Sequence, residues 1–124
     1  MVIHGRVSAM RELLRSAAVR RATISFPQIF QLFDENVAPH DVYDTLEAAC
    51  VQLADWSVGI YSVVLAKTGT LLPGDGFFDI FRLHREVEYQ RIAARAHVRE
   101  LSLEQRRQMV AFERERVYAH ATAS

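Results

Sequence analysis

The predicted fold depends on one stretch of sequence, Ile60-Tyr-Ser-Val-Val-Leu-Ala-Lys-Thr-Gly-Thr-Leu-Leu72. Residues 60–66 form a nearly continuous apolar run rich in β-favouring side chains, which is typical of a buried strand. Residues 67–70 carry a turn signal, and Leu71 and Leu72 can form a short returning strand. The stretch therefore predicts a strand, a turn and a second strand.

Helical patterns precede this hairpin. Residues 6–19 and about 39–55 carry apolar side chains at spacings of three and four, which is typical of amphipathic helices. Between them, residues 22–25 favour a short strand. Ser25 and the glutamine three residues later have the spacing of a capping box, which predicts a short helix over about 26–34. The order helix, strand, helix, helix, strand, turn, strand is that of a winged helix.

Two more helices are predicted after the tight turn at residues 73–76. One begins near Phe77, and a second capping-box spacing, Ser102 with Gln105, predicts a last helix that ends near Tyr118. The predicted fold is therefore α+β and mainly helical, in a single domain. It has a winged-helix-like core over about 6–76 with a small antiparallel sheet, and two added C-terminal helices over about 77–119.

Length and composition fit one globular domain, because 124 residues suit a single core. The single cysteine, Cys50, excludes an internal disulfide. No apolar run approaches the roughly 18 residues of a membrane span, and arginines interrupt the first 21 residues, which therefore lack the apolar stretch of a signal peptide. We expect a cytoplasmic protein and no membrane partner.

Charge is unevenly distributed although the formal net charge is zero. Residues 1–22 carry five arginines against one glutamate, a net charge of +4. Residues 23–81 carry one lysine against eight acidic residues, a net charge of −7, and residues 82–124 carry nine arginines against six glutamates, a net charge of +3. The simplest interpretation of an acidic middle between two basic ends is that the ends pack against the middle and neutralise it.

Three segments carry a resemblance: Thr23-Ile-Ser-Phe26, Ser62-Val-Val-Leu-Ala-Lys-Thr-Gly69 and Pro73-Gly-Asp-Gly-Phe-Phe78. Together with Glu115-Arg-Val-Tyr118 they resemble small, largely uncharacterised bacterial and phage proteins with a T-[IV]-[ST]-[FY], V-V-x-K-x-T-G and P-G-x-G-F-F pattern. The resemblance is moderately specific, covers about half of the chain and supplies no activity.

The first of these segments is also similar, more weakly, to the T-[TV]-[ST]-Y segment that opens the helix-turn-helix in the winged-helix domain of DNA alkyltransferases. The reactive Pro-Cys-His-Arg of those enzymes is absent, and Cys50 lies on the apolar side of a predicted helix. Alkyl transfer is therefore not predicted.

No set of residues predicts an enzyme. His84 and Glu88 are four residues apart on one predicted helix face, but a structural zinc site needs four protein ligands and a catalytic one usually three. We interpret them as a solvated polar face. Cys50 has no recognisable base beside it, so a buried, inert cysteine is predicted. We predict no catalytic, cofactor-binding or metal-binding residues.

The predicted winged-helix fold suggests nucleic-acid binding, but the charge of its predicted recognition helix argues against that function. In a helix-turn-helix the second helix enters the major groove. Its counterpart here, about 39–55, has four acidic residues and no lysine or arginine. Phosphates would repel that helix, since affinity for DNA comes largely from phosphate neutralisation. A nucleic-acid binder would have to use the basic ends, with Arg11, Arg15, Arg20 and Arg21 as candidates.

The leading hypothesis is a small non-enzymatic protein-interaction module, a regulator or inhibitor encoded by a phage or mobile element. Its candidate partner-binding residues are Asp41, Asp44 and Glu47, on the acidic helix. The alternatives are a winged-helix nucleic-acid-binding protein that uses the basic N- and C-terminal helices, and an unrecognised enzyme. A homodimer through the C-terminal helices is compatible with all three hypotheses.

Overall fold

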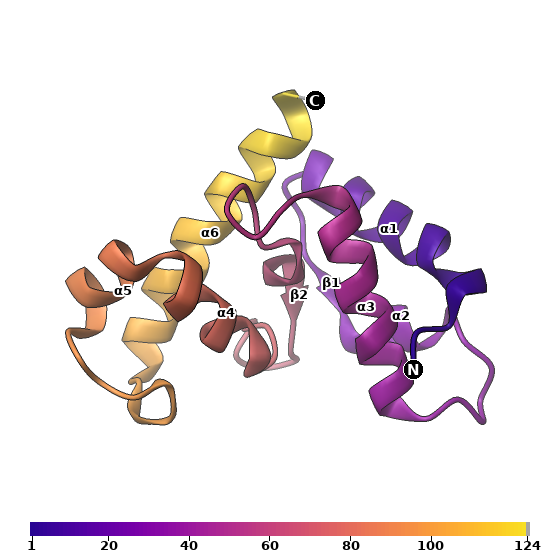
Figure 1. The fold of residues 1–124 in the computed structure, drawn as a ribbon, viewed down its shortest axis with the longest axis horizontal. Helices are drawn as coiled ribbons and strands as arrows, with labels where there is room; N and C mark the ends of the chain where they lie inside the picture. Colours follow the sequence, from indigo (N-terminus) through magenta and orange to yellow (C-terminus); the bar gives the residue numbers. More distant parts are fainter. Residues whose placement is uncertain (124) are drawn as a thin grey trace.

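Six α-helices, two short 3₁₀-helices and one two-stranded sheet form the fold of residues 1–123, which are the residues that the computed structural model describes (Figure 1). In chain order the elements are α1 (His4–Val19), β1 (Ile24–Ser25), α2 (Phe26–Phe30), α3 (Pro39–Leu53), η1 (Tyr61–Val64), β2 (Leu65–Ala66), α4 (Gly76–His84), α5 (Glu86–Ala93), η2 (Val98–Glu100) and α6 (Leu103–Ala123). The fold is therefore mainly helical with a small sheet, as predicted.

The predicted amphipathic helices α1 and α3 are confirmed, and they pack against each other (Figure 1). Met10 and Leu14 of α1 and Val42 and Ala49 of α3 have no exposed surface. Burial of a leucine, valine or methionine side chain contributes roughly 1.5–3 kcal/mol to stability. The long helix α6 contacts α1, α5 and η1, so the C-terminal helices pack on the same core.

The sheet is parallel, and the predicted antiparallel sheet is wrong. Ile24 of β1 pairs with Leu65 of β2, and Ser25 pairs with Ala66. Most of the apolar run that predicted a strand, residues 61–64, winds into the 3₁₀-helix η1 instead. Each strand is only two residues long, so the sheet contributes little of the fold.

The turn predicted at residues 67–70 is present, but Leu71 and Leu72 after it do not form the predicted returning strand. The N–H of Lys67 donates to the carbonyl of Leu72 at 2.8 Å, and the N–H of Leu71 donates back to the carbonyl of Lys67 at 2.9 Å. The guanidinium of Arg114 on α6 donates to the carbonyls of Val63, Leu65 and Leu71 at 2.8, 3.1 and 2.8 Å. Arg114 therefore binds carbonyl groups that would otherwise be available to accept hydrogen bonds from a pairing strand.

Both predicted capping boxes are confirmed. The N–H of Gln28 donates to Ser25 Oγ and the N–H of Ser25 donates to Gln28 Oε1, at 3.3 and 2.8 Å. Ser102 and Gln105 exchange the same pair of bonds at the start of α6. That helix runs to Ala123, past its predicted end. Among residues 1–123 no helix combines the length and the apolar character that a membrane crossing requires.

The C-terminal part holds three α-helices within the described residues, where two were predicted. The predicted helix from Phe77 ends at His84, and α5 begins at Glu86. Arg85 between them has a non-helical backbone, with φ −127° and ψ 52°. This break turns the Arg85 side chain into the protein, where it has 7% of its surface exposed.

Arg85 forms a buried ion pair with Glu113 of α6. Arg85 Nε donates to Glu113 Oε1 at 2.8 Å and Arg85 Nη2 donates to Oε2 at 3.0 Å. The N–H of Ile60 also donates to Oε2, at 3.0 Å, and Glu113 has no exposed surface. One carboxylate thus joins α6 to the α4–α5 junction and to the residue before η1.

Breaking this pair should destabilise the protein strongly. We expect Arg85→Met to lower the free energy of unfolding by about 3–5 kcal/mol, because Glu113 would keep a buried charge without its partner. The measurement is urea unfolding followed by circular dichroism. Arg91→Met, which removes the exposed pair with Glu88, is the control and should cost at most about 1 kcal/mol. Equal losses in the two variants would contradict this assignment.

Candidate functional site

Asp41, Asp44 and Glu47 all lie on α3, as their sequence positions predicted. The N-terminal amine of Met1 donates hydrogen bonds to Asp41, at 2.8 Å, and to Asp44. The bond from the amine holds the pKa of the Asp41 carboxyl below its usual value, and it raises the pKa of the amine. Glu47 is exposed and forms no ion pair within residues 1–123. The N-terminus therefore partly neutralises two of the three carboxylates.

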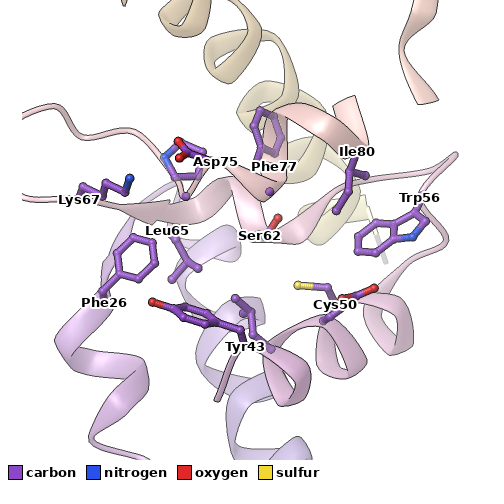
Figure 2. Close-up of a pocket in the computed structure, with 15 residues that line it drawn as sticks. Phe26, Tyr43, Cys50, Trp56, Ser62, Leu65, Lys67, Asp75, Phe77 and Ile80 are labelled. Atoms are coloured by element: carbon purple, nitrogen blue, oxygen red, sulfur yellow. The ribbon is translucent and has the colours of Figure 1, made fainter. Parts of the chain in front are cut away.

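A pocket of about 380 Å³ lies beside α3, between this helix, the η1–β2 segment and α4 (Figure 2). This volume is within the range of roughly 300–1,000 Å³ that ligand pockets occupy. The lining residues are Phe26, Tyr43, Leu46, Glu47, Cys50, Trp56, Ser62, Leu65, Lys67, Pro73, Gly74, Asp75, Gly76, Phe77 and Ile80. Most of this lining is apolar. The set is called the α3 pocket below.

Three segments that are separate in the sequence contribute residues to the α3 pocket, namely 23–26, 62–69 and 73–78. Phe26 ends the first segment, residues 62–67 belong to the second and residues 73–77 belong to the third. Sequence reasoning missed the pocket because these segments are far apart along the chain.

Aromatic side chains form much of the wall. Figure 2 shows Phe26 and Tyr43 toward one end of the α3 pocket and Trp56 toward the other. The rings of Phe26 and Tyr43 meet edge to face, with centroids 6.5 Å apart, and Tyr43 also meets Phe30 edge to face at 5.8 Å. Tyr43 is 44% exposed. An apolar guest can therefore pack against both the faces and the edges of these aromatic rings.

Cys50 and Ser62 place polar atoms within the buried wall of the pocket. Cys50 is fully buried, as predicted, and burial raises the pKa of its thiol, with the Glu47 carboxylate adding to the effect. The thiol is therefore protonated at neutral pH and is a poor nucleophile. The Ser62 hydroxyl oxygen is buried and is the only such side-chain atom within residues 1–123 that has no hydrogen-bond partner.

Three charged side chains stand at the rim of the α3 pocket. Glu47 and Asp75 are acidic, and Lys67 is the only lysine in the sequence. All three are exposed. Asp75 lies 3.7 Å from Arg106 and is 84% exposed, so this ion pair is weak. The rim is mixed in charge, and its acidic side continues along α3 into Asp44.

The candidate nucleic-acid-binding arginines all have partners within the protein. Arg11 donates to Gln52 Oε1 at 2.5 Å, Arg15 to Glu12 at 2.9 Å, Arg20 to the carbonyl of Ser16 at 3.1 Å, and Arg21 to Glu115. The guanidinium of Arg21 also lies over the ring of Tyr118. These bonds are exposed and individually weak, but they place each guanidinium against a protein group.

Arginines of the basic C-terminal end bind the backbone of the acidic middle. Arg114 binds three carbonyls between residues 63 and 71, as described above. Arg116 donates to the carbonyls of Val58 and Ser57 at 2.9 and 3.0 Å. Burial lowers the pKa of Arg114. The C-terminal end therefore packs against the middle through backbone carbonyls, whereas the N-terminal amine binds the carboxylates of Asp41 and Asp44.

The residues considered for catalysis do not form a common site. His84 is in α4 and its ring lies beside Trp56, whereas Glu88 is in α5 and pairs with Arg91 at 2.6 Å. Within residues 1–123, no three His, Cys, Asp or Glu side chains gather as metal ligands would. The comparisons with known proteins give no match to a family model, a curated protein or a solved structure.

The unpartnered hydroxyl of Ser62 should lower the stability of the folded protein. We expect Ser62→Ala to raise the free energy of unfolding by about 1 kcal/mol, because a buried hydroxyl without a partner is unfavourable. Urea unfolding monitored by Trp56 fluorescence measures this change.

Thr45→Val is the matched control. Its hydroxyl is buried, accepts from the N–H of Ile3 at 2.9 Å and donates to the carbonyl of Asp41 at 2.8 Å. We expect a loss of about 1–3 kcal/mol in this variant. A loss of similar size in Ser62→Ala would mean that the Ser62 hydroxyl has a stabilising partner.

Proposed function

We propose that this protein is a small non-enzymatic interaction module, a regulator or inhibitor, that binds another protein through α3 and the pocket beside it. The observation that carries the proposal is the position of Glu47, which belongs both to the acidic side of α3 and to the rim of the α3 pocket. An acidic surface and an apolar concavity are thus continuous, as in interfaces where a polar rim surrounds an apolar centre.

Charge and apolar contact have different parts in this proposal. The carboxylates of Asp44 and Glu47 attract a basic partner and favour its correct orientation, which mainly increases the association rate. The apolar lining supplies most of the affinity once water is displaced from it. The internal use of the arginines supports the choice of α3 over the basic ends.

The proposal keeps one part of the predicted winged helix, which is the chain order of α1, β1, α2 and α3. In that order α3 stands where a DNA-reading helix would stand, and it carries acidic side chains in place of basic ones. Such a helix suits the nucleic-acid-binding groove of another protein. The parallel pairing of β1 with β2 argues against a wing of the usual antiparallel kind.

Panning of short random peptides displayed on phage against the immobilised protein tests this function. We expect enrichment of peptides rich in lysine and arginine, and its loss in the variant Asp41→Asn/Asp44→Asn/Glu47→Gln. The control variant Asp34→Asn/Glu35→Gln/Glu86→Gln loses three exposed carboxylates elsewhere and should keep the enrichment. No enrichment of basic peptides, or equal loss in both variants, would overturn the proposed function.

A further inference from the structure

The α3 pocket has features that select among the side chains a partner can insert. Its interior is apolar and its walls include Phe26, Tyr43, Trp56 and Phe77 (Figure 2). Aromatic rings pack edge to face or offset with each other, and such pairs add to the free energy gained from burial alone. An aromatic guest therefore gains more from this wall than an aliphatic guest of equal area.

One polar group in the wall of the pocket also lacks a hydrogen-bond partner. The hydroxyl of Ser62 is buried in this lining without a partner, and native proteins leave few such groups unpaired. Phenylalanine would leave it unpaired. A tyrosine hydroxyl or a tryptophan indole N–H brings an apolar body and a polar atom together, and this is the combination that the pocket lacks.

The rim indicates which residues flank that side chain in the partner. Glu47 faces solvent at the pocket, and the half-exposed Asp44 lies one helical turn before it. Asp44 is already bound by the Met1 amine, so a lysine or arginine next to the inserted side chain would meet mainly the Glu47 carboxylate. Lys67 alone opposes a basic neighbour, and Asp75 stands on the same rim.

The arrangement also favours a polypeptide over a free small molecule. The exposed face of Tyr43 and the carboxylate of Asp44 lie on α3 beyond the pocket interior, where a small guest would leave them in water. A protein segment covers both the pocket and this face of the helix. Aromatic side chains in such pockets are frequent centres of binding energy at interfaces.

We propose that the α3 pocket holds a tyrosine or tryptophan side chain from a lysine- or arginine-rich segment of the partner protein. This inference rests on the proposed function and specifies the chemistry of the partner. The Ser62 hydroxyl, turned toward the guest by rotation about its Cα–Cβ bond, binds the polar atom of the inserted ring. The aromatic wall packs against the ring, and Glu47 binds the flanking positive charge.

Titration of ¹⁵N-labelled protein with blocked tripeptides, followed by NMR, tests the inference. The probes are acetyl-Arg-Tyr-Arg-amide, acetyl-Arg-Ala-Arg-amide and acetyl-Glu-Tyr-Glu-amide. We expect the first probe to shift the amide signals of Ser62, Leu65 and Gly74. The alanine and glutamate probes should each bind about tenfold more weakly, because one lacks the anchor and the other is repelled at the rim.

Three variants separate the contributions. Tyr43→Ala removes part of the wall and should weaken the first probe about tenfold, whereas Val51→Ala, at a similarly exposed position on the same helix, should not. Ser62→Ala should weaken it about threefold to tenfold through the lost hydrogen bond. Glu47→Lys should favour the glutamate probe over the arginine probe and leave the requirement for the ring unchanged.

The outcomes distinguish this inference from the proposed function. If the arginine probes bind α3 equally well with tyrosine or alanine, the inference is overturned and the acidic surface keeps its role. If the glutamate probe binds the unaltered protein more tightly than the arginine probe does, the partner is not basic, and both proposals are overturned. Absence of shifts at the pocket with all three probes overturns the inference, and peptide panning then decides the function separately.

Discussion

The carboxylate of Glu113 is the point at which three separate segments of this protein are held together. It binds the guanidinium of Arg85 at the α4–α5 junction and the N–H of Ile60 just before η1. Those two segments adjoin α4 and η1, and both of these elements contribute residues to the lining of the α3 pocket. Burying an ion pair carries a large desolvation penalty, which is offset here because both carboxylate oxygens accept hydrogen bonds. The geometry of the pocket therefore depends on a bond outside it.

Arginines of α6, the helix that carries Glu113, account for part of the uneven charge distribution. Arg114 and Arg116 bind carbonyls between residues 57 and 71, where the backbone is irregular and has carbonyls to satisfy. These two arginines of α6 thus serve the packing of that helix against the preceding segments. Glu47 has no such partner within residues 1–123 and stands at the rim of the α3 pocket, which is why the proposed function is placed there.

Local signals in the sequence predicted local structure well. The spacing of apolar residues predicted α1 and α3, and Ser25 and Ser102 predicted the starts of α2 and α6, since each of these features depends on neighbours along the chain. The turn at residues 67–70 was predicted, but residues 61–64 and the sheet pairing were mispredicted, since Glu113 and Arg114, far away in sequence, bind the backbone of this segment. The pocket was missed because its lining comes from segments far apart in sequence; Glu47 was predicted only as part of an acidic helix surface.

The most direct test of this account is the fluorescence anisotropy of labelled duplex DNA titrated with the protein at low salt. The account holds that Arg11, Arg15, Arg20 and Arg21 bind groups of the protein itself and that α3 repels phosphate, so it predicts no rise in anisotropy. Tight binding that weakens steeply as salt is added would show that the basic ends neutralise phosphates. That result would contradict the assignment of α3 and its pocket as the working surface.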